Sequence, residues 1–242
     1  MKIESINNNK VKEWTKLKEK KYRDLNNMYI IEGDHILNAA LIKGVVLEII
    51  STDKVFEIPG IPFYEVTDAI IKKISSQVSP SKVIGICKKF ENKEITGNVC
   101  ILDNIKDPGN FGTIIRSAVA FNINTIIMSN DTVDLYNEKV IRASEGMLYN
   151  LNYLKGDLKE IITELKNNEY NIYGTDVNNG IALEKVEFKY KSAIIIGNEG
   201  NGMNKNLLPL CDKLINIPIN NKCESLNAGV AASIIFYEMG GF

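Results

Sequence analysis

The chain has 242 residues, of which 45% are hydrophobic and 24% are charged, and its formal net charge at pH 7 is −1. This composition is typical of a globular protein and excludes a disordered tail or a coiled coil. No apolar run reaches the roughly 18 residues of a membrane span, and the Lys-rich start lacks the apolar stretch of a secretory signal. We therefore expect a cytoplasmic protein that does not contact the membrane.

Histidine and cysteine usage narrows the chemistry further. His35 is the only histidine, so it would have to serve any catalytic triad or imidazole metal site. The cysteines show no CxxC pairing, and we expect reduced thiols that mostly fill the core: Cys87, Cys100, Cys211 and Cys223. The sequence predicts no metal site.

The first part of the chain predicts a small α/β unit that begins with a basic helix. Val11, Trp14 and Leu17 recur at near-helical spacing within residues 8–24, and eight of the first 24 residues are basic. Further elements are expected at 28–31 (strand), 35–42 (helix), 45–50 (strand), 67–75 (helix) and 82–88 (strand). Residues 1–96 carry 16 basic and 13 acidic side chains, a balance of +3. Such a helix is either a solvated face or an element that contacts nucleic acid.

A polar segment at 89–98 is the candidate linker, and it places a domain boundary near residue 95. We therefore expect one domain over 1–95 and another over 96–242. In the second, apolar strands alternate with helices: strands at 99–102, 125–128, 171–174, 193–196 and 214–217, and helices near 112–121, 135–144, 157–167 and 225–239. This alternation predicts a parallel sheet covered on both faces, with ligands bound beyond the carboxyl ends of its strands.

The first unusual segment after a predicted strand spans residues 103–118. A turn with Pro and Gly leads into a helix that is expected to carry Arg116 in its second turn. The segment is either a plain strand-to-helix loop with a surface arginine, or a site where Asn110 and Arg116 converge on a polar or anionic substrate group.

Two further segments follow later strands. Residues 194–203 contain glycines in the order G-x-x-G-x-G, which is not the dinucleotide fingerprint, so a phosphate cradle is disfavoured and close backbone approach to a flat ligand is favoured. Residues 217–233 contain a polar loop and then small residues, with Ser225 as a plausible helix N-cap. The small residues indicate either tight helix packing or a ligand that lies very close.

Together the three segments resemble the signature motifs of the SpoU (TrmH-like) branch of the SPOUT RNA methyltransferases. The matching positions are an altered N-x-x-G-x-x-x-R motif at 110–116, the G-N-E-G turn at 197–200 and I-P…S-L-N at 217–227. The run Val140–Gly146 is similar to another segment of that family. More weakly, residues 5–12 and 31–33 resemble the family's substrate-binding domain.

This resemblance implies an α/β fold in which a small RNA-binding domain precedes a parallel-sheet domain tied as a deep trefoil knot. It implies S-adenosylmethionine bound in the knot, with the adenine met by backbone at Gly197, Ile217 and Leu226. It further implies a homodimer whose site both subunits complete, and a ribosomal or transfer RNA as the partner. Loop 219–224 lacks the Met and Gly that many members carry before the S-L-N motif.

The reaction implied by the resemblance is methyl transfer to a ribose 2′-hydroxyl, which requires no metal. Arg116 is the family's proposed proton acceptor, although a guanidinium normally keeps its proton and can instead fix a phosphate. Positioning roles fall to the polar neighbours Asn110, Glu199, Ser225 and Asn227. Two alternatives remain: a non-catalytic RNA-binding protein on this scaffold, and a nicotinamide oxidoreductase, which the missing G-x-G-x-x-G disfavours.

Overall fold

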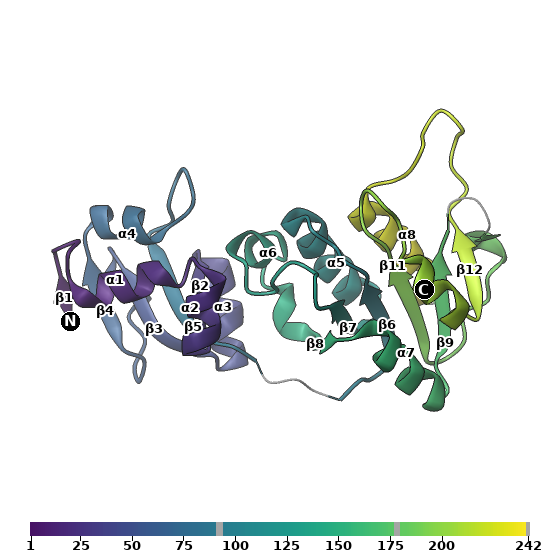
Figure 1. The fold of residues 1–242 in the computed structure, drawn as a ribbon. Coiled ribbons are helices and arrows are strands. Elements are labelled where there is room, and N and C mark those ends of the chain that lie inside the picture. Colours follow the sequence, from purple (N-terminus) through teal and green to yellow (C-terminus); the bar gives the residue numbers. More distant parts are fainter. Residues whose placement is uncertain (91–93, 177–179, 241–242) are drawn as a thin grey trace. The chain divides into compact units, whose positions relative to one another are not determined.

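The computed structural model describes residues 1–90, 94–176 and 180–240 (Figure 1). The chain folds into two compact units, each made from two stretches of sequence. The first comprises Met1–Glu91 and Asp134–Tyr149, and the second comprises Asn92–Val133 and Asn150–Phe242. Residues 91–93 of the expected linker lie outside the described residues, and the domain boundary near residue 95 stays a prediction.

The first unit is built on a five-stranded mixed sheet with the strand order β1-β4-β3-β5-β2. Its strands are β1 (Lys2–Ile3), β2 (Met28–Glu32), β3 (Val46–Ser51), β4 (Phe63–Val66) and β5 (Val83–Lys88). Its α-helices are α1 (Asn9–Lys16), α2 (Lys20–Asn26), α3 (Asp34–Lys43), α4 (Asp68–Ile74) and α6 (Glu138–Ala143). The sequence did not predict β1 or β4, which pair in parallel with one another at the edge of this sheet.

The single helix expected over 8–24 is wrong, because the chain turns between α1 and α2. The guanidinium of Arg23 donates through Nη1 to the carbonyls of Leu17 (3.1 Å), the C-cap of α1, and of Lys18 (2.7 Å), so two carbonyls of the turn after α1 have a side-chain partner. Its Nε and Nη2 donate to Oδ2 of Asp134, at 3.0 and 2.7 Å. A contact 111 residues away in sequence therefore stabilises this corner, and no local pattern could predict it.

The apolar side of α1 is buried as the helical spacing predicts. Val11, Trp14 and Leu17 are at most 3% exposed and pack with Ile50 of β3 and Ile70 of α4. Burial of each such side chain stabilises the fold by about 1.5–3 kcal/mol. The opposite side of α1 is left to its polar residues.

The second unit contains a seven-stranded parallel sheet with the order β10-β12-β9-β11-β6-β7-β8, as the alternation of strands and helices predicts. Its strands are β6 (Asn98–Leu102), β7 (Ile123–Ser129), β8 (Asn152–Gly156), β9 (Asn171–Thr175), β10 (Ile181–Ala182), β11 (Ser192–Ile196) and β12 (Lys213–Asn216). The edge strands β8 and β10 were not predicted. β8 (NYLKG) is mixed in polarity and β10 is only two residues long, so neither carries the long apolar run of the central strands.

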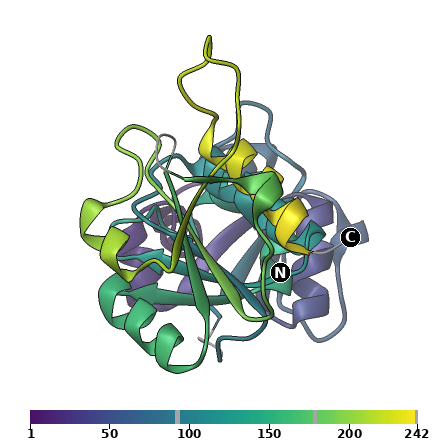
Figure 2. The same cartoon turned by 90° about the vertical axis from the view of Figure 1, so that its right-hand side faces the viewer.

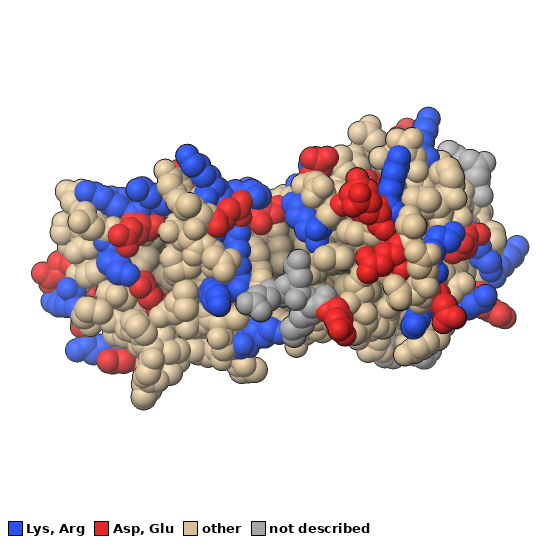
Figure 3. Space-filling model, turned by 60° about the horizontal axis from the view of Figure 1, so that its bottom comes forward, with Lys and Arg blue, Asp and Glu red and all other residues tan. Residues whose placement is uncertain are grey.

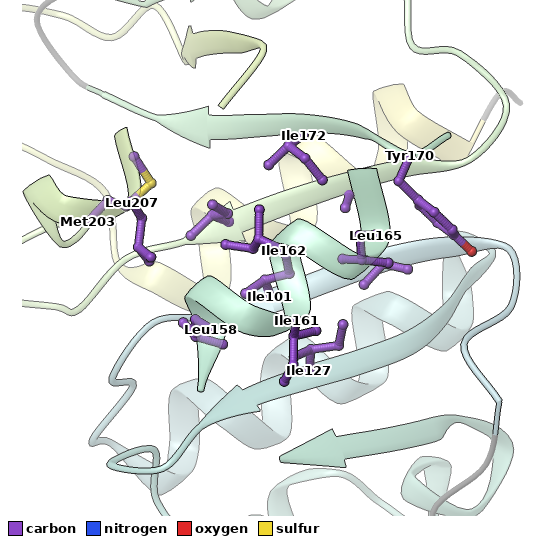
Figure 4. Close-up of a cluster of buried hydrophobic side chains, with 13 residues drawn as sticks. Ile101, Ile127, Leu158, Ile161, Ile162, Leu165, Tyr170, Ile172, Met203 and Leu207 are labelled. Carbon is purple, nitrogen blue, oxygen red and sulfur yellow. The ribbon is translucent and has the colours of Figure 1, made fainter. Parts of the chain in front are cut away.

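Helices cover both faces of this sheet, with α7 (Leu158–Asn167) on one face and α5 (Pro108–Ala120) and α8 (Ala228–Gly240) on the other (Figure 2). Under α7, Ile162 and Leu165 join Ile101 of β6 and Ile172 of β9 in one buried apolar cluster (Figure 4). This buried cluster holds the central parts of the strands in place. The loops that follow the carboxyl ends of the strands can therefore form a site. No helix in the described ranges is long and apolar enough to cross a membrane.

Candidate functional site

A cavity of about 370 Å³ lies at the carboxyl ends of β9, β11 and β12, beside the start of α8. Gly197, Ile217 and Leu226, the three residues expected to meet a cofactor, all line it. Glu199 and Ser225 line it as well, whereas Asn110, Arg116 and Asn227 are not among its lining residues. Segments that follow three different strands thus meet at one edge of the sheet, as parallel strands require.

Gly197 is needed by the turn that follows β11. A Cβ placed there would lie 2.3 Å from the backbone nitrogen of Met203 and 2.4 Å from the carbonyl carbon of Gly202. The turn folds back on itself through two hydrogen bonds, from Asn198 N to Gly202 O (3.0 Å) and from Gly202 N to Asn198 O (2.9 Å). The turn's own backbone therefore occupies the space that a side chain at 197 would need, and the close approach of the three glycines to a flat ligand stays a prediction.

Glu199 organises the loop between β6 and α5. Its Oε1 accepts hydrogen bonds from Asn110 Nδ2 (3.0 Å) and the Asp107 amide (3.1 Å), and its Oε2 accepts from the Lys106 amide (3.2 Å). Partial burial opposes ionisation, but these hydrogen bonds outweigh it and place the pKa of Glu199 below its ordinary value. The carboxylate is therefore ionised at neutral pH, where it is a poor proton acceptor and a good anchor for this loop.

Asn110 and Asn227 connect the start of α5 to the start of α8. Asn227 Nδ2 donates to Asn110 Oδ1 at 2.7 Å, and Asn110 is only 7% exposed. Asn227 Oδ1 in turn accepts from the amides of Gly229 (2.9 Å) and Val230 (3.2 Å). Asn227 is thus the N-cap of α8, and the assignment of that role to Ser225 is wrong. One polar network joins all three signature segments.

Arg116 lies apart from this network. It is exposed on the third turn of α5, because the helix begins at Pro108, earlier than predicted. Two side chains that are six residues apart on a helix point in directions that differ by about 120°. Arg116 and Asn110 therefore do not converge within one chain. In the described part of the chain, Arg116 has no hydrogen bond or ion pair. Its neighbour Ser117 shares a hydrogen bond with Ser233 of α8, at 2.6 Å.

Two residues that shape the site lie in the segments that follow predicted strands, but no role was predicted for them from the sequence. Asp107 is the N-cap of α5, since its Oδ1 accepts from the Asn110 amide at 2.7 Å and Pro108 takes the first helical position. Asn198 Oδ1 accepts from the amides of Gly200 and Asn201, both at 3.0 Å, and so closes the turn after β11. Asp before Pro and Asn between glycines are recognisable cap and turn signals.

The cavity has the features of a site for a small amphipathic molecule. Its volume lies within the roughly 300–1,000 Å³ common to ligand pockets. Ile215, Leu226 and Ile235 contribute apolar lining. Asn216 also lines the cavity, and its buried Oδ1 has no hydrogen-bond partner among the residues the structure describes. An occupant with apolar faces and hydrogen-bond donors fits these residues.

A second, more polar cavity of about 690 Å³ lies at the ends of β6, β7 and β8. It shares the turn at 198 and 201–203 with the first cavity, and Asp103, Asp131 and Asp157 are among its lining residues. Burial raises the pKa of Asp103, although a hydrogen bond from the Asn204 amide opposes this effect. Within the described ranges, no group of three or more His, Cys, Asp or Glu side chains could hold a metal ion.

Comparisons with known proteins agree with this geometry. Residues 97–237 match the SpoU rRNA Methylase family, and residues 8–85 match the MRM3-like substrate binding domain. The chain is 34% identical over 246 residues to the 23S rRNA (guanosine(2553)-2'-O)-methyltransferase RlmP of Bacillus subtilis, with 99% of each chain covered.

Solved structures share the fold. The AdoMet-bound rRNA methyltransferase of Sinorhizobium meliloti superimposes with a TM-score of 0.90 at 24% identity, covering 99% of this chain and 97% of that one. AviRb of Streptomyces viridochromogenes, in complex with AdoMet, superimposes with a TM-score of 0.86 at 22% identity, covering 96% of this chain and 97% of that one. The resemblance inferred from the three motifs is thereby confirmed, and the chain belongs to the SpoU rRNA methylase family.

Proposed function

We propose that this chain is a cytoplasmic ribose 2′-O-methyltransferase that uses S-adenosylmethionine and acts on a guanosine of 23S ribosomal RNA. The observation that carries the proposal is the convergence of three strand-end segments on one cavity, beside the network of Glu199, Asn110 and Asn227. The substrate is taken from the Bacillus subtilis relative, which aligns along the whole chain. A ribosomal RNA is therefore preferred to a transfer RNA.

The cofactor belongs in the first cavity. Gly197, Ile217 and Leu226 line it and would surround the adenine, while Asn216 Oδ1 offers an acceptor for a donor of the nucleoside. When bound, the cofactor supplies an electrophilic methyl group on a sulfonium centre. No metal ligand is needed for such a transfer.

Most of the polar residues of the site act by positioning. Glu199 holds the 106–110 loop, Asn110 bridges to Asn227, and Asn227 fixes the first turn of α8. Ser225 lines the cavity next to Leu226. Arg116 is free to contact RNA, either as a clamp on the phosphate beside the target ribose or in removal of the hydroxyl proton.

The site requires a second copy of the chain to become complete. Val230, Ile234 and Tyr237 of α8 are 46%, 38% and 54% exposed and follow one side of that helix. Arg116 lies on α5, the helix that packs beside α8 through Ser117 and Ser233. Apolar exposure of this kind fits an isologous dimer contact, which would carry Arg116 towards the cavity of the partner. Light scattering at micromolar concentration should report a dimer, and the mass of one chain would contradict this.

The threading of the chain as a trefoil knot is part of the same proposal and follows from the family fold. A knotted chain that is unfolded and pulled from both ends should stop short of the roughly 3.3–3.6 Å per residue of a fully extended chain. An unknotted chain would reach that length.

Two measurements test the activity. Calorimetry without added metal should give binding of S-adenosylmethionine and of its demethylated product, and ribose-methylation mapping of total RNA should lose one 23S position when the gene is deleted. Binding of RNA with no binding of either cofactor form would favour the non-catalytic alternative. Heat with NAD alone would favour the oxidoreductase.

A further inference from the structure

The solvent side of α1 and α2 carries a ridge of three lysines around one tyrosine, which we call the α1–α2 ridge: Lys12, Lys16, Lys21 and Tyr22. The three lysines are exposed, and Lys12 and Lys16 lie one helical turn apart on α1. The ammonium groups of Lys16 and Lys21 lie 5.5 and 5.8 Å from the centre of the half-buried Tyr22 ring. Figure 3 shows Lys and Arg side chains gathered along the upper edge of the N-terminal unit.

The ridge lysines differ from the other lysines of the same two helices. Lys10 is paired with Glu48 at 2.6 Å, and Lys20 is paired with Asp24. In the part of the chain that the structure describes, no carboxylate forms an ion pair with a ridge lysine. The ridge charges are therefore available to an external anion, whereas the flanking charges are already neutralised.

The corner that presents the ridge is held by buried polar contacts. Arg23 is 5% exposed and connects the end of α1 to Asp134, as described above. Lys18 Nζ donates to the carbonyls of Lys73 (2.9 Å) and Ser75 (2.7 Å) at the end of α4. A solvated helix face does not require such anchoring. A surface that must meet a partner in one geometry gains affinity when its elements are fixed beforehand.

We infer that the α1–α2 ridge is the RNA-docking surface of the first unit and that it binds a single-stranded stretch of the substrate RNA. Lys12, Lys16 and Lys21 contact consecutive phosphates, and Tyr22 offers its ring to an unstacked base. The inference rests on the proposed function and assigns the residues that recruit the RNA. Ammonium groups without carboxylate partners beside an aromatic ring fit a polyanion with flat bases better than a run of Asp or Glu side chains, which carry no ring to stack.

The first experiment compares two triple variants of the full-length chain that lose the same charge. Lys12→Gln/Lys16→Gln/Lys21→Gln removes the ridge, and Lys88→Gln/Lys185→Gln/Lys213→Gln removes three exposed lysines elsewhere. Binding to a fluorescein-labelled, mixed-sequence 20-nucleotide single-stranded RNA is measured from 50 to 300 mM KCl. The ridge variant should bind more weakly and lose about 2 from the slope of log affinity against log salt, since each phosphate contact contributes about 0.7.

The control triple should keep the slope of the wild type, and both triples should bind S-adenosylmethionine with wild-type affinity. Equal loss of RNA affinity in both triple variants would show that net charge alone attracts RNA, and it would overturn the assignment of RNA docking to the ridge. An unchanged slope in the ridge variant would overturn it as well. A wild-type chain that binds neither RNA nor S-adenosylmethionine would overturn the proposed function itself.

The second experiment separates stacking from charge. Tyr22→Leu should lower affinity for the single-stranded RNA by about 5- to 150-fold, the range for loss of one base–aromatic stack, with the salt slope unchanged. Tyr22→Phe should keep wild-type affinity, because the ring remains. A blocked acidic peptide of ten Asp residues should not compete at concentrations that saturate RNA binding. An affinity of the Tyr22→Leu variant equal to that of the wild type, or competition by the peptide, would contradict base stacking at the ridge.

Discussion

The two units hold their polar groups in opposite ways. In the second unit, Glu199, Asn110 and Asn227 satisfy one another and the starts of two helices. In the first unit, Lys12 and Lys16 are exposed and form no ion pair among the described residues, and the ammonium of Lys16 lies over the ring of Tyr22. A site that must place a small ligand to within a fraction of an ångström requires fixed groups. A surface that meets a long polyanion requires exposed charges without protein partners, because affinity comes from released counterions.

The largest expected effect concerns the buried ion pair between Arg23 and Asp134, which runs against this contrast in the first unit. The two side chains are 6% and 14% exposed. Asp134→Ala should lower the free energy of unfolding by about 3–5 kcal/mol, because it leaves a buried guanidinium without its anion. Urea unfolding of wild type and variant measures this. Asp53→Ala, an exposed aspartate in the same unit, is the control, and equal stability of both variants would contradict the assignment.

A loss of rate without a loss of stability is expected at Arg116, a charge of the second unit that forms no ion pair among the described residues. Arg116→Ala should keep the fold and the affinity for S-adenosylmethionine but lower single-turnover methylation of the RNA by at least about 10²-fold. Arg116→Lys separates the two roles, because a phosphate clamp tolerates Lys in part and a proton acceptor does not. Near-wild-type turnover of the Ala variant would show that the chemistry is centred elsewhere.

A moderate effect is expected where the network caps a helix. Asn227→Ala removes the N-cap of α8 and the donor to Asn110, and it should lower the free energy of unfolding by about 1–2 kcal/mol. Asn227→Asp keeps the capping oxygen but cannot donate to Asn110. The Asp variant should therefore recover most of the stability and little of the methylation rate, measured by thermal melts and single-turnover assays. Equal recovery of both properties would mean that the bridge to Asn110 has no role in the reaction.

The smallest effect concerns pH and Glu199. Its pKa is lower in the folded chain than its ordinary value of 4.5, so the stabilisation that it contributes is complete above that value. The contribution is lost as the pH falls through the lower folded pKa. The difference in melting temperature between wild type and Glu199→Gln should therefore be constant from pH 7 to about 5.5 and shrink below 4.5. A difference that grows in acid would have the wrong sign.

The sequence predicted the parallel sheet and the three signature segments because both depend on local patterns. Buried strands such as 193–196 are continuous apolar runs, and glycine, proline and asparagine mark the turns that follow them. The cavity-lining roles of Gly197, Ile217 and Leu226 came from the resemblance and not from spacing. Local patterns could not predict long-range contacts. The pairing of Arg23 with Asp134 stabilises the turn that divides the expected first helix. The hydrogen bond from Asn227 to Asn110 holds the residue before α8, which starts later than the expected last helix.

The membership of Asp134–Tyr149 in the first unit bears on how the chain folds during its synthesis. A ribosome adds about 5–20 residues per second, so Asp134 emerges roughly 6–22 s after Arg23, 111 residues earlier. Once Lys88 at the end of β5 has been made, the first sheet is complete in sequence, while the guanidinium of Arg23 still lacks the carboxylate of Asp134. The ion pair between Arg23 and Asp134 therefore forms only after two strands of the second sheet, β6 and β7, have been made.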